Sequence, residues 1–534
     1  MTCSIRREAG CCVLSALFAT ALAGCSLESA RPTRDAAAHD TSLSHDVIVP
    51  VDSPSDHGVA LDTGPSDSGP KLDSAAHDTP SSQDVVVVAD GSNDDAPDAA
   101  RNDAPVADAP AIDAPSSDTI STSDAGSSPD IVTTMSAVQR IADPQVPAAD
   151  STTLASDNAA FAFSAYRQLI STHANLVLSP ASISIALAMT YAGAATKTAT
   201  EMAQALHFTL PPAQLHPAFN ALDQALASRG QGFLGGDGGP MKVDIANAIW
   251  AEQTYTFRSD FLNTLAANYG AGVNLLDFVT APDPSRMTIN AWVAAQTDNK
   301  IQNLLPFGVI TNGTRLVLTN AVYFNAAWNT PFDPSKTQDG SFTLLDGSKV
   351  TASFMNAYLP LPAMRGTNFV AASLPCADTR LSLVVVVPDA DQFSQVESSL
   401  DATALRTLMT GLTNQPVILT LPRFQIETGT NLVELLQTLG MTSAFIPGSA
   451  DFSGMDGTRT LYITHVFHDA SINVAENGTK GAGGTGVVIG SGASGPPAPT
   501  GLLVNANRPF IYFLRDDPTG AILFMGRVLN PSQN

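Results

Sequence analysis

The composition of this 534-residue chain changes sharply near residue 150, and that change limits where a fold can form. Residues 25–150 consist mainly of Asp, Ala, Pro, Ser and Thr and contain no aromatic side chain. Such a segment has too little apolar surface, and too much like charge, to offset the conformational entropy of folding. Residues 151–534 are rich in Leu, Val, Phe and Ala and can bury a large core. The sequence therefore predicts a disordered acidic tether at 25–150, followed by a folded domain at 151–534.

The first residues have the features of an export signal. The apolar run at 11–22 is too short to span a bilayer comfortably. It ends in the motif Leu22-Ala-Gly-Cys25, which resembles the bacterial lipobox, where the signal is cut before a cysteine whose thiol carries lipid. The resemblance implies a signal peptide at 1–24 and a membrane anchor through a lipid on Cys25. Because Ser26 follows, we expect an exported protein on the outer membrane or cell surface, with its folded domain extracellular or periplasmic.

Charge and motif content exclude several classes of function. The formal net charge is −24 and no Lys/Arg cluster is present, so nucleic acid is not expected as a partner. The histidines are scattered without zinc-ligand spacing, and we expect no metal and no cofactor. No G-x-S-x-G nucleophile motif occurs, so we predict no catalytic residue and no enzyme. Without residues 1–24 only Cys25 and Cys376 remain; we expect no disulfide, with Cys376 packed as a small hydrophobe.

A series of short motifs in the folded part resembles the serpin family in its order along the chain. Each match is modest, but together they cover about residues 154–531. The motifs are Asn175-Leu-Val-Leu-Ser179-Pro-Ala-Ser182, Asn247-Ala-Ile-Trp250, Leu316-Val-Leu-Thr-Asn320 continuing to Trp328, Leu421-Pro-Arg423-Phe, His465-Val-Phe-His468 and Phe524-Met-Gly526-Arg-Val-Leu-Asn-Pro531.

The resemblance implies an α+β serpin fold with three β-sheets, about nine helices and an exposed reactive-centre loop. It also implies a suicide-type protease inhibitor. A target protease attacks the loop as a substrate and forms an acyl-enzyme. The cut loop then inserts as a new strand into the main sheet, and the attached protease is distorted. We therefore expect a monomer whose partner is a protease.

Residues 476–489, with the sequence ENGTKGAGGTGVVI, match the hinge of that loop. Strand residues alternate between faces, so every second residue from Thr479 onward would point inward after insertion. Those residues are all small or apolar, while Lys480 falls on the outward face. This phase argument comes from the residues alone and favours an inhibitory protein. The hinge residues that the resemblance names are Glu476, Gly478, Thr479, Gly481, Ala482, Gly483, Gly484 and Thr485.

Other residues take supporting roles by resemblance, in two regions of the main sheet. The sheet opens at the shutter, which would contain Ser179, Ser182, Asn320 and His468. The top of the sheet is the breach, which would contain Trp328 and a pair formed by Arg423 and Glu476. The simpler interpretations are a hydrogen-bonded core histidine and an ordinary surface ion pair of little energetic weight.

The loop is less informative about the target protease. The family's usual spacing from Glu476 places the reactive bond at Gly492 and Ala493, whereas counting back from Pro509 places it near Ala498. No Arg or Lys lies between Lys480 and Arg508, so a trypsin-type protease would find no anchor. We expect an elastase-like or subtilisin-like serine protease, with papain-like cysteine proteases as the alternative.

Two further classes of function stay open. A non-inhibitory binding protein on the same scaffold, such as a carrier or adhesin on the cell surface, would be favoured by a charged or bulky residue at Thr479. Threonine at that position counts against it. A hydrolytic enzyme would need a nucleophile clustered with a base, and the sequence shows no such cluster.

Overall fold

The computed structural model describes residues 131–479 and 500–533. The described part begins ahead of the boundary that composition places at residue 151. A short strand, β1 (Val132–Thr134), and the first turn of helix α1 (Ala148–Leu169) both precede that residue. Residue 151 therefore lies inside α1 rather than before it.

Residues 131–147 are ordered by partners far along the chain. β1 pairs antiparallel with β4 (Val273–Leu276). Arg140 donates to Asn220 Oδ1 (2.8 Å) and to Asp223 Oδ2 (2.6 Å). None of these partners is adjacent in sequence, which explains why local composition does not identify this segment as part of the fold.

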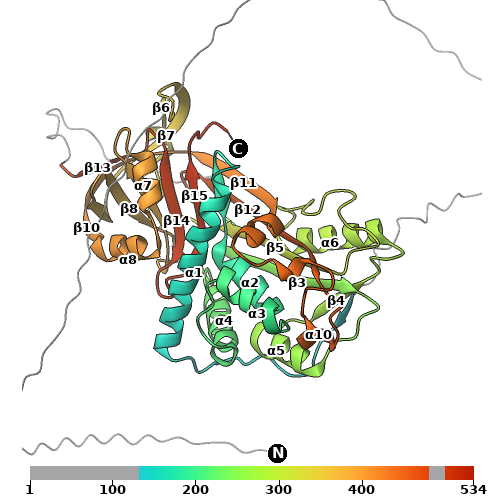
Figure 1. Cartoon of the computed structure of the whole chain (residues 1–534). Coiled ribbons are helices and arrows are strands. Elements are labelled where there is room, and N and C mark those ends of the chain that lie inside the picture. Colours follow the sequence, from blue (N-terminus) through green and yellow to red (C-terminus); the bar gives the residue numbers. More distant parts are fainter. Residues whose placement is uncertain (1–130, 480–499, 534) are drawn as a thin grey trace, which may run out of the picture. The chain divides into compact units, whose positions relative to one another are not determined.

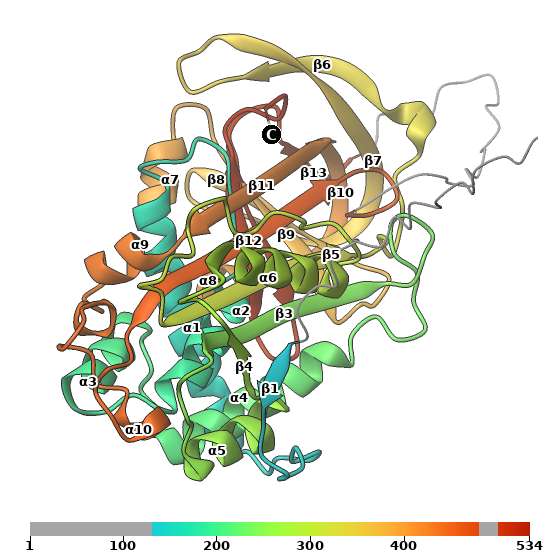
Figure 2. The same cartoon turned by 90° about the vertical axis from the view of Figure 1, so that its right-hand side faces the viewer.

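The main sheet contains six strands in the order β1-β4-β3-β5-β12-β11. Helix α6 (Pro282–Gln296) lies across the front of this sheet (Figure 2). A separate apolar cluster under α6 joins Trp250, Ile289 and Phe467. The longer strands of the sheet are β3 (Lys242–Glu252), β5 (Leu316–Asn325), β11 (Phe424–Asn431) and β12 (Ile463–Val474).

The other two sheets are joined by one long strand, β7 (Lys349–Arg365). Residues 349–354 of β7 pair with β6, residues 354–363 with β10, and residues 363–365 with β8. The ladder order is β13-β10-β7-β8-β9-β14-β15-β2, with β6 beside β7. Its strands are β2 (Leu176–Leu178), β6 (Gln338–Thr343), β8 (Phe369–Pro375), β9 (Leu381–Pro388), β10 (Thr413–Pro422), β13 (Leu502–Asn505), β14 (Phe510–Asp516) and β15 (Ile522–Val528).

Helix α2 (Pro180–Tyr191) occupies the centre of the molecule, between the main sheet and β15 (Figure 1). It is buried from its first residue to Thr190, so it has no polar face. Pro180 is the first residue of the helix, where a backbone N–H would have no acceptor within the helix, so proline costs no hydrogen bond there. The remaining helices are α3 (Thr196–Ala205), α4 (Pro212–Ala227), α5 (Ser259–Tyr269), α7 (Phe393–Ser399), α8 (Ala402–Gly411), α9 (Val433–Thr438) and α10 (Ser453–Asp456), with short 3-10 turns at η1 (Pro334–Lys336) and η2 (Ser443–Phe445).

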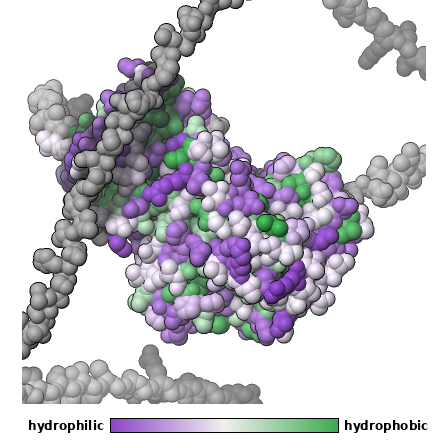
Figure 3. Space-filling view, viewed as in Figure 1, coloured by the Kyte–Doolittle hydropathy of each residue, from purple (hydrophilic) through white to green (hydrophobic). Residues whose placement is uncertain are grey.

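The described residues thus contain ten α-helices, close to the number that the sequence resemblance implies. On the face in Figure 3, hydrophilic and hydrophobic residues are interspersed. None of the described helices combines enough length with enough apolar character to cross a membrane.

Gly526 is a position in β15 where the fold leaves no room for a side chain. A Cβ at this residue would lie 1.8 Å from the carbonyl oxygen of Leu176 in β2. We predict that Gly526→Ala lowers the free energy of unfolding by about 3 kcal/mol or more, because β2 would have to separate from β15. Thermal melting followed by circular dichroism measures the change.

The matched control is Gly313→Ala. Its Cβ would meet only Thr311 Oγ1, at 3.6 Å, so its melting temperature should stay near that of the parent. Equal melting temperatures for Gly526→Ala and the parent would show that β2 and β15 are not in close contact in solution.

Candidate functional site

The strands β5 and β12 run parallel to each other at the centre of the main sheet. On their outer sides each has an antiparallel neighbour, β3 beside β5 and β11 beside β12. Their mutual pairing extends from Leu316 and Ile463 to Val322 and Ala470, and the last residues of both strands are not paired with each other. A strand running in the opposite direction could enter at this end and pair antiparallel with both.

The chain reverses its direction directly after β12, in a tight turn from Ala475 to Gly478. The Ala475 N–H donates to the Gly478 carbonyl (2.9 Å), and the Gly478 N–H donates to the Ala475 carbonyl (3.2 Å). Gly478 has a φ of 150°, and a Cβ there would lie 2.0 Å from the Ala326 carbonyl oxygen. Only glycine fits this approach. The turn directs the returning chain toward the end of β5.

Thr479 is the first residue of the returning chain and is already docked at that end. Its N–H donates to the Ala326 carbonyl (2.8 Å), and its Oγ1 accepts from the Ala326 N–H (2.9 Å). The residue is 1% exposed. A charged side chain at position 479 would therefore be buried without a partner.

Glu476 is held in the same turn by four hydrogen bonds, three from a guanidinium group and one from a hydroxyl. Arg423 Nε donates to both carboxylate oxygens of Glu476 (2.8 and 2.9 Å), and Nη2 donates to Oε1. Thr337 Oγ1 donates to the same Oε1 (2.5 Å). Burial favours the neutral carboxyl, but the hydrogen bonds from Arg423 and Thr337 outweigh that effect and lower the pKa of Glu476. The structure therefore places Arg423 and Glu476 together, with Glu476 ionised.

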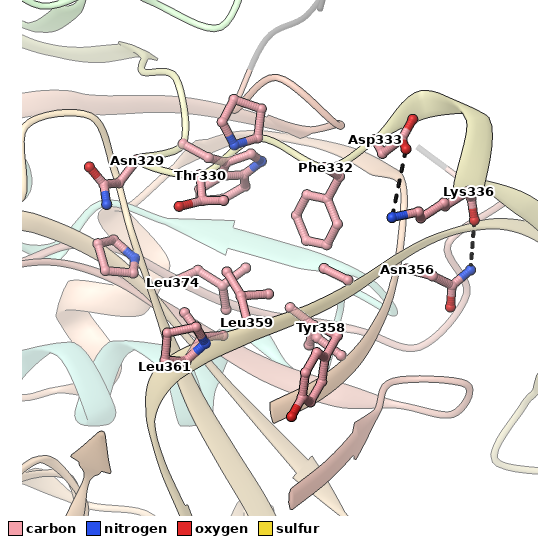
Figure 4. A pocket seen from close by; sticks show the side chains of 16 residues that line it. Asn329, Thr330, Phe332, Asp333, Lys336, Asn356, Tyr358, Leu359, Leu361 and Leu374 are labelled. Carbon is pink, nitrogen blue, oxygen red and sulfur yellow. Dashed lines mark hydrogen bonds and ion pairs between the residues drawn. The ribbon is translucent and has the colours of Figure 1, made fainter. Parts of the chain in front are cut away.

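Trp328, which follows β5, forms hydrogen bonds with the turn at 475–478. Its indole Nε1 donates to the Ala475 carbonyl (2.8 Å), and its backbone N–H donates to the Asn477 carbonyl (3.0 Å). The Phe332 N–H donates to the Glu476 carbonyl (2.9 Å). On its other side the segment 328–336 borders a cavity of about 190 Å³, into which Phe332 points (Figure 4). The turn is thus fixed from one side by this segment.

Lower in the sheet, four of the sequence-selected residues form one hydrogen-bonded group. His468 Nε2 accepts from the Ser179 N–H (3.3 Å), and its Nδ1 lies 2.5 Å from Asn320 Oδ1. Asn320 Nδ2 donates to Ser182 Oγ. Burial lowers the pKa of His468 to about 3, so the ring is neutral. An acceptor role for Nε2 requires the proton on Nδ1, which can then donate to Asn320.

Asn247 on β3 completes this group and was not among the candidate site residues. Its Oδ1 accepts from Asn320 Nδ2 and from Ser182 Oγ (3.3 Å), and its Nδ2 donates to the Ser182 carbonyl (3.2 Å). The sequence carried a signal for it, because an asparagine inside the apolar strand Asn247-Ala-Ile-Trp needs a polar partner. Which partner it finds depends on α2 and β5, which are distant in sequence.

A family model described as Serpin (serine protease inhibitor) matches residues 156–531, well over half of the chain. The chain belongs to the serpin family. A leukocyte elastase inhibitor of Equus caballus is 33% identical over 389 residues, covering 71% of this chain and 99% of that protein. An uncharacterized serpin-like protein of Thermococcus kodakarensis is 33% identical over 371 residues, covering 70% of this chain and 84% of that protein.

Solved structures show the same fold. Tengpin, a thermophilic serpin solved in its native state, has a TM-score of 0.66 and 28% identity, covering 75% of this chain and 99% of tengpin. Human thyroxine-binding globulin in complex with thyroxine has a TM-score of 0.62 and 27% identity, covering 72% of this chain and all of that chain. The family and the α+β fold with three sheets, both expected from the sequence motifs, are thus confirmed.

Several sequence-selected positions of this serpin lie outside the described residues. They are Cys25, the hinge residues Gly481, Ala482, Gly483, Gly484 and Thr485, and the reactive-bond candidates Gly492 and Ala493. Cys376 is described and fully buried, and burial raises the pKa of its thiol far above the ordinary value. Within residues 131–479 and 500–533 no cluster of His, Cys, Asp or Glu is arranged to hold a metal ion.

Asp469 lies next to the shutter group and is the one charge on the stretch of β12 that pairs with β5. It is 8% exposed, and its Oδ1 has no hydrogen-bond partner in the described structure. Burial raises its pKa to about 7, and the negative charge of Glu427 on β11 contributes to the rise. The ionised form of Asp469 therefore destabilises the main sheet beside the contact between β5 and β12.

We predict that Asp469→Asn raises the melting temperature at pH 8 and leaves it nearly unchanged at pH 4. The folded pKa lies above the ordinary value of 3.8, so the folded state holds the proton more tightly. This contribution to stability is consequently complete below about pH 3.8 and is lost as pH rises from 3.8 to about 7. Removing the charge should recover roughly 2–4 kcal/mol at pH 8. Melting curves at both pH values test this.

The matched control is Glu434→Gln, an exposed carboxyl at the start of α9. It should show no such pH-dependent difference. An Asp469→Asn variant with the same melting temperature as the parent at pH 8 would contradict the assignment of strain to Asp469.

Proposed function

We propose that this serpin is a suicide-type protease inhibitor that traps a serine protease as a covalent complex by inserting its cut loop between β5 and β12. One observation carries the proposal: Thr479 already occupies the end of β5, at the open end of the only parallel contact between long strands in the described part of the sheet. The turn at 475–478 reverses the chain after β12, so a strand continuing from Thr479 would run antiparallel to β12, as insertion requires. The serpin itself contributes no catalytic group, so it is not an enzyme.

The covalent step belongs to the protease. Its serine Oγ bonds to the carbonyl carbon of the cut peptide, the C–N bond breaks, and the new amine end leaves with the proton. The acyl ester then links the protease to the chain ahead of the cut. Insertion of that chain between β5 and β12 would carry the protease to the far end of the sheet before water can reach the ester.

The loop composition points to the target class. The absence of Arg and Lys between Lys480 and Arg508 favours a protease with a small specificity pocket, and we propose an elastase-like or subtilisin-like enzyme. Relatives that share about a third of the sequence bear the name leukocyte elastase inhibitor, which agrees with this choice. Papain-like cysteine proteases are the second target class.

The competing function is a non-inhibitory binding protein on the serpin scaffold. Thyroxine-binding globulin, solved with thyroxine bound, shows that a protein with this fold can carry a small molecule. The two functions differ in what happens after cleavage, because a binding protein would be clipped and released. The buried, uncharged Thr479 supports the inhibitor.

The test is to incubate the full-length chain with pancreatic elastase, subtilisin and papain, and to run denaturing gels after boiling. We expect a band with the combined mass of serpin and protease for at least one serine protease, because an acyl ester survives denaturation. Sequencing the released peptide gives the reactive bond. Simple clipping by all three enzymes would favour the binding scaffold instead.

Thr479→Arg is the matched variant for the same gel assay. Arginine at a site that is 1% exposed would bury a charge, so the variant should be cut at the same bond and form no complex. Thr407→Arg, on the exposed side of α8, is the control and should inhibit as the parent does. Complex formation by Thr479→Arg at the parent level would contradict insertion.

We further propose that the protein is exported, cut before Cys25 and held on the outer membrane or cell surface by a lipid on that cysteine, as a monomer. The support is the motif Leu22-Ala-Gly-Cys25 with its preceding apolar run. When the full chain is expressed in a Gram-negative host, it should fractionate with membranes and incorporate labelled palmitate, while Cys25→Ala should do neither. Equal labelling of both would contradict lipidation at Cys25.

A further inference from the structure

Asp469 lies on β12 close to the point where the pairing of this strand with β5 ends. Its register partners are Ala321 on β5 and Gly429 on β11. Its neighbour His468 belongs to the shutter group, and because successive strand residues point to opposite faces, Asp469 points to the other face of the sheet. Phe467 and Ala321 on that face belong to the apolar cluster under α6. The carboxyl group is therefore placed on an apolar face, beside the contact that insertion would open.

The charge of an ionised Asp469 finds little compensation in the closed sheet. The residue is 8% exposed, and its Oδ1 has no hydrogen-bond partner in the described structure. On the side of β11 the nearest position is Gly429, where a Cβ would lie 3.4 Å from Asp469 Oδ2. The charge that acts on Asp469 from β11 is that of Glu427, which has the same sign. A buried carboxylate in such surroundings is less favourable than the neutral acid.

The other ionisable groups around this face do not take over that role. Burial lowers the pKa of His465, which lies on the same face of β12. Burial and nearby aspartates raise the pKa of Tyr323 on β5 to about 12, so this phenol stays neutral. The charged residues of α6, Asp283 and Arg286, pair with each other (2.6 Å). Burial and the charge on β11 raise the pKa of Asp469 to about 7, so its charge changes near neutral pH.

Separation of β5 from β12 would change the surroundings of this carboxyl group. The side of β12 that now faces Ala321 would become accessible to water. Hydration stabilises a carboxylate far more than it stabilises a neutral acid. The ionised form of Asp469 would therefore gain more from the opening than the protonated form, and its barrier to opening would be lower.

We propose that Asp469 controls strand insertion according to pH: loss of its proton speeds the opening of the contact between β5 and β12, and gain of the proton keeps the contact closed. This inference rests on the proposed inhibition by loop insertion and adds a regulation to it. Faster insertion leaves less time for water to hydrolyse the acyl ester. The serpin would therefore trap a larger share of its target protease in neutral and alkaline solution than in acid.

The test measures strand entry without a protease. A peptide with the sequence of residues 479–489, with an uncharged fluorescent label and an amidated end, is incubated with the full-length chain, and native gels follow its incorporation from pH 5.5 to pH 8.5. Lys480 is the only ionisable side chain in this sequence, and its charge is constant over that range. We expect incorporation at least about fivefold faster at pH 8.5 than at pH 5.5. No incorporation at any pH, or a rate independent of pH, would overturn the inference.

Two variants assign the effect to this carboxyl group. Asp469→Asn is neutral at every pH and should incorporate the peptide throughout at the slow rate that the parent shows in acid. Glu427→Gln removes the repelling charge and lowers the pKa of Asp469, so the rise in rate should persist but move to lower pH. Glu434→Gln at the start of α9 is the control and should leave the position of the rise unchanged. Parental pH dependence in Asp469→Asn would place the titrating group elsewhere and contradict the inference.

The gel assay with proteases separates this inference from the proposed function. If no covalent complex forms, but incorporation of the peptide still depends on pH through Asp469, the proposed inhibition fails and the control of sheet opening stands. If the covalent complex forms, but the parent incorporates the peptide at the same rate at every pH, the proposed inhibition stands and this inference fails.

Discussion

The parallel contact between β5 and β12 is the constraint on which the rest of the molecule depends. Both strands have antiparallel partners on their outer sides, and their own pairing stops at Val322 and Ala470. Beyond those residues the two strands are not paired with each other, and a strand of opposite direction that entered there could pair antiparallel with both. The turn after β12 sends the chain back toward β5, and in the proposed mechanism the residues after Thr479 become such a strand. The proposed inhibition is a consequence of this topology.

Two groups of contacts hold that interface in its present form. At the upper end, Trp328 and Arg423 bind the turn through its carbonyl groups and through Glu476. In the middle, a network around His468 connects β12 to α2 and β5 through groups that are buried and almost fully paired. On the opposite face of the same strand, the ionised form of Asp469 opposes folding. Stabilising and destabilising groups thus lie within one short stretch of β12.

Asp469 in the main sheet and Asn158 on α1 are two of the buried side chains that have a polar atom without a hydrogen-bond partner in the described structure. In the hydrogen-bonded network around His468 the buried polar groups are almost fully paired. A buried polar group without a partner elsewhere in the fold is therefore an exception that needs an explanation. At Asp469 the unpaired oxygen lies beside the strand interface that would open, where stored strain can serve the proposed mechanism. At Asn158 neither polar atom of the amide has a partner, and the side chain is buried within the helical part of the fold.

The sequence by itself determined the family, the α+β class, and the small, uncharged character of the residues that follow Glu476, because motif order and strand alternation are local properties that can be read from the printed chain. It also paired Arg423 with Glu476 by resemblance. It did not reveal the ordered segment at 131–147, the role of Asn247, the raised pKa of Asp469 or the unpaired amide of Asn158. Only the tertiary structure decided these, because each depends on which distant residues a side chain meets after folding: burial and hydrogen-bond partners arise from contacts across the sheets and helices, and no local pattern of residues specifies them.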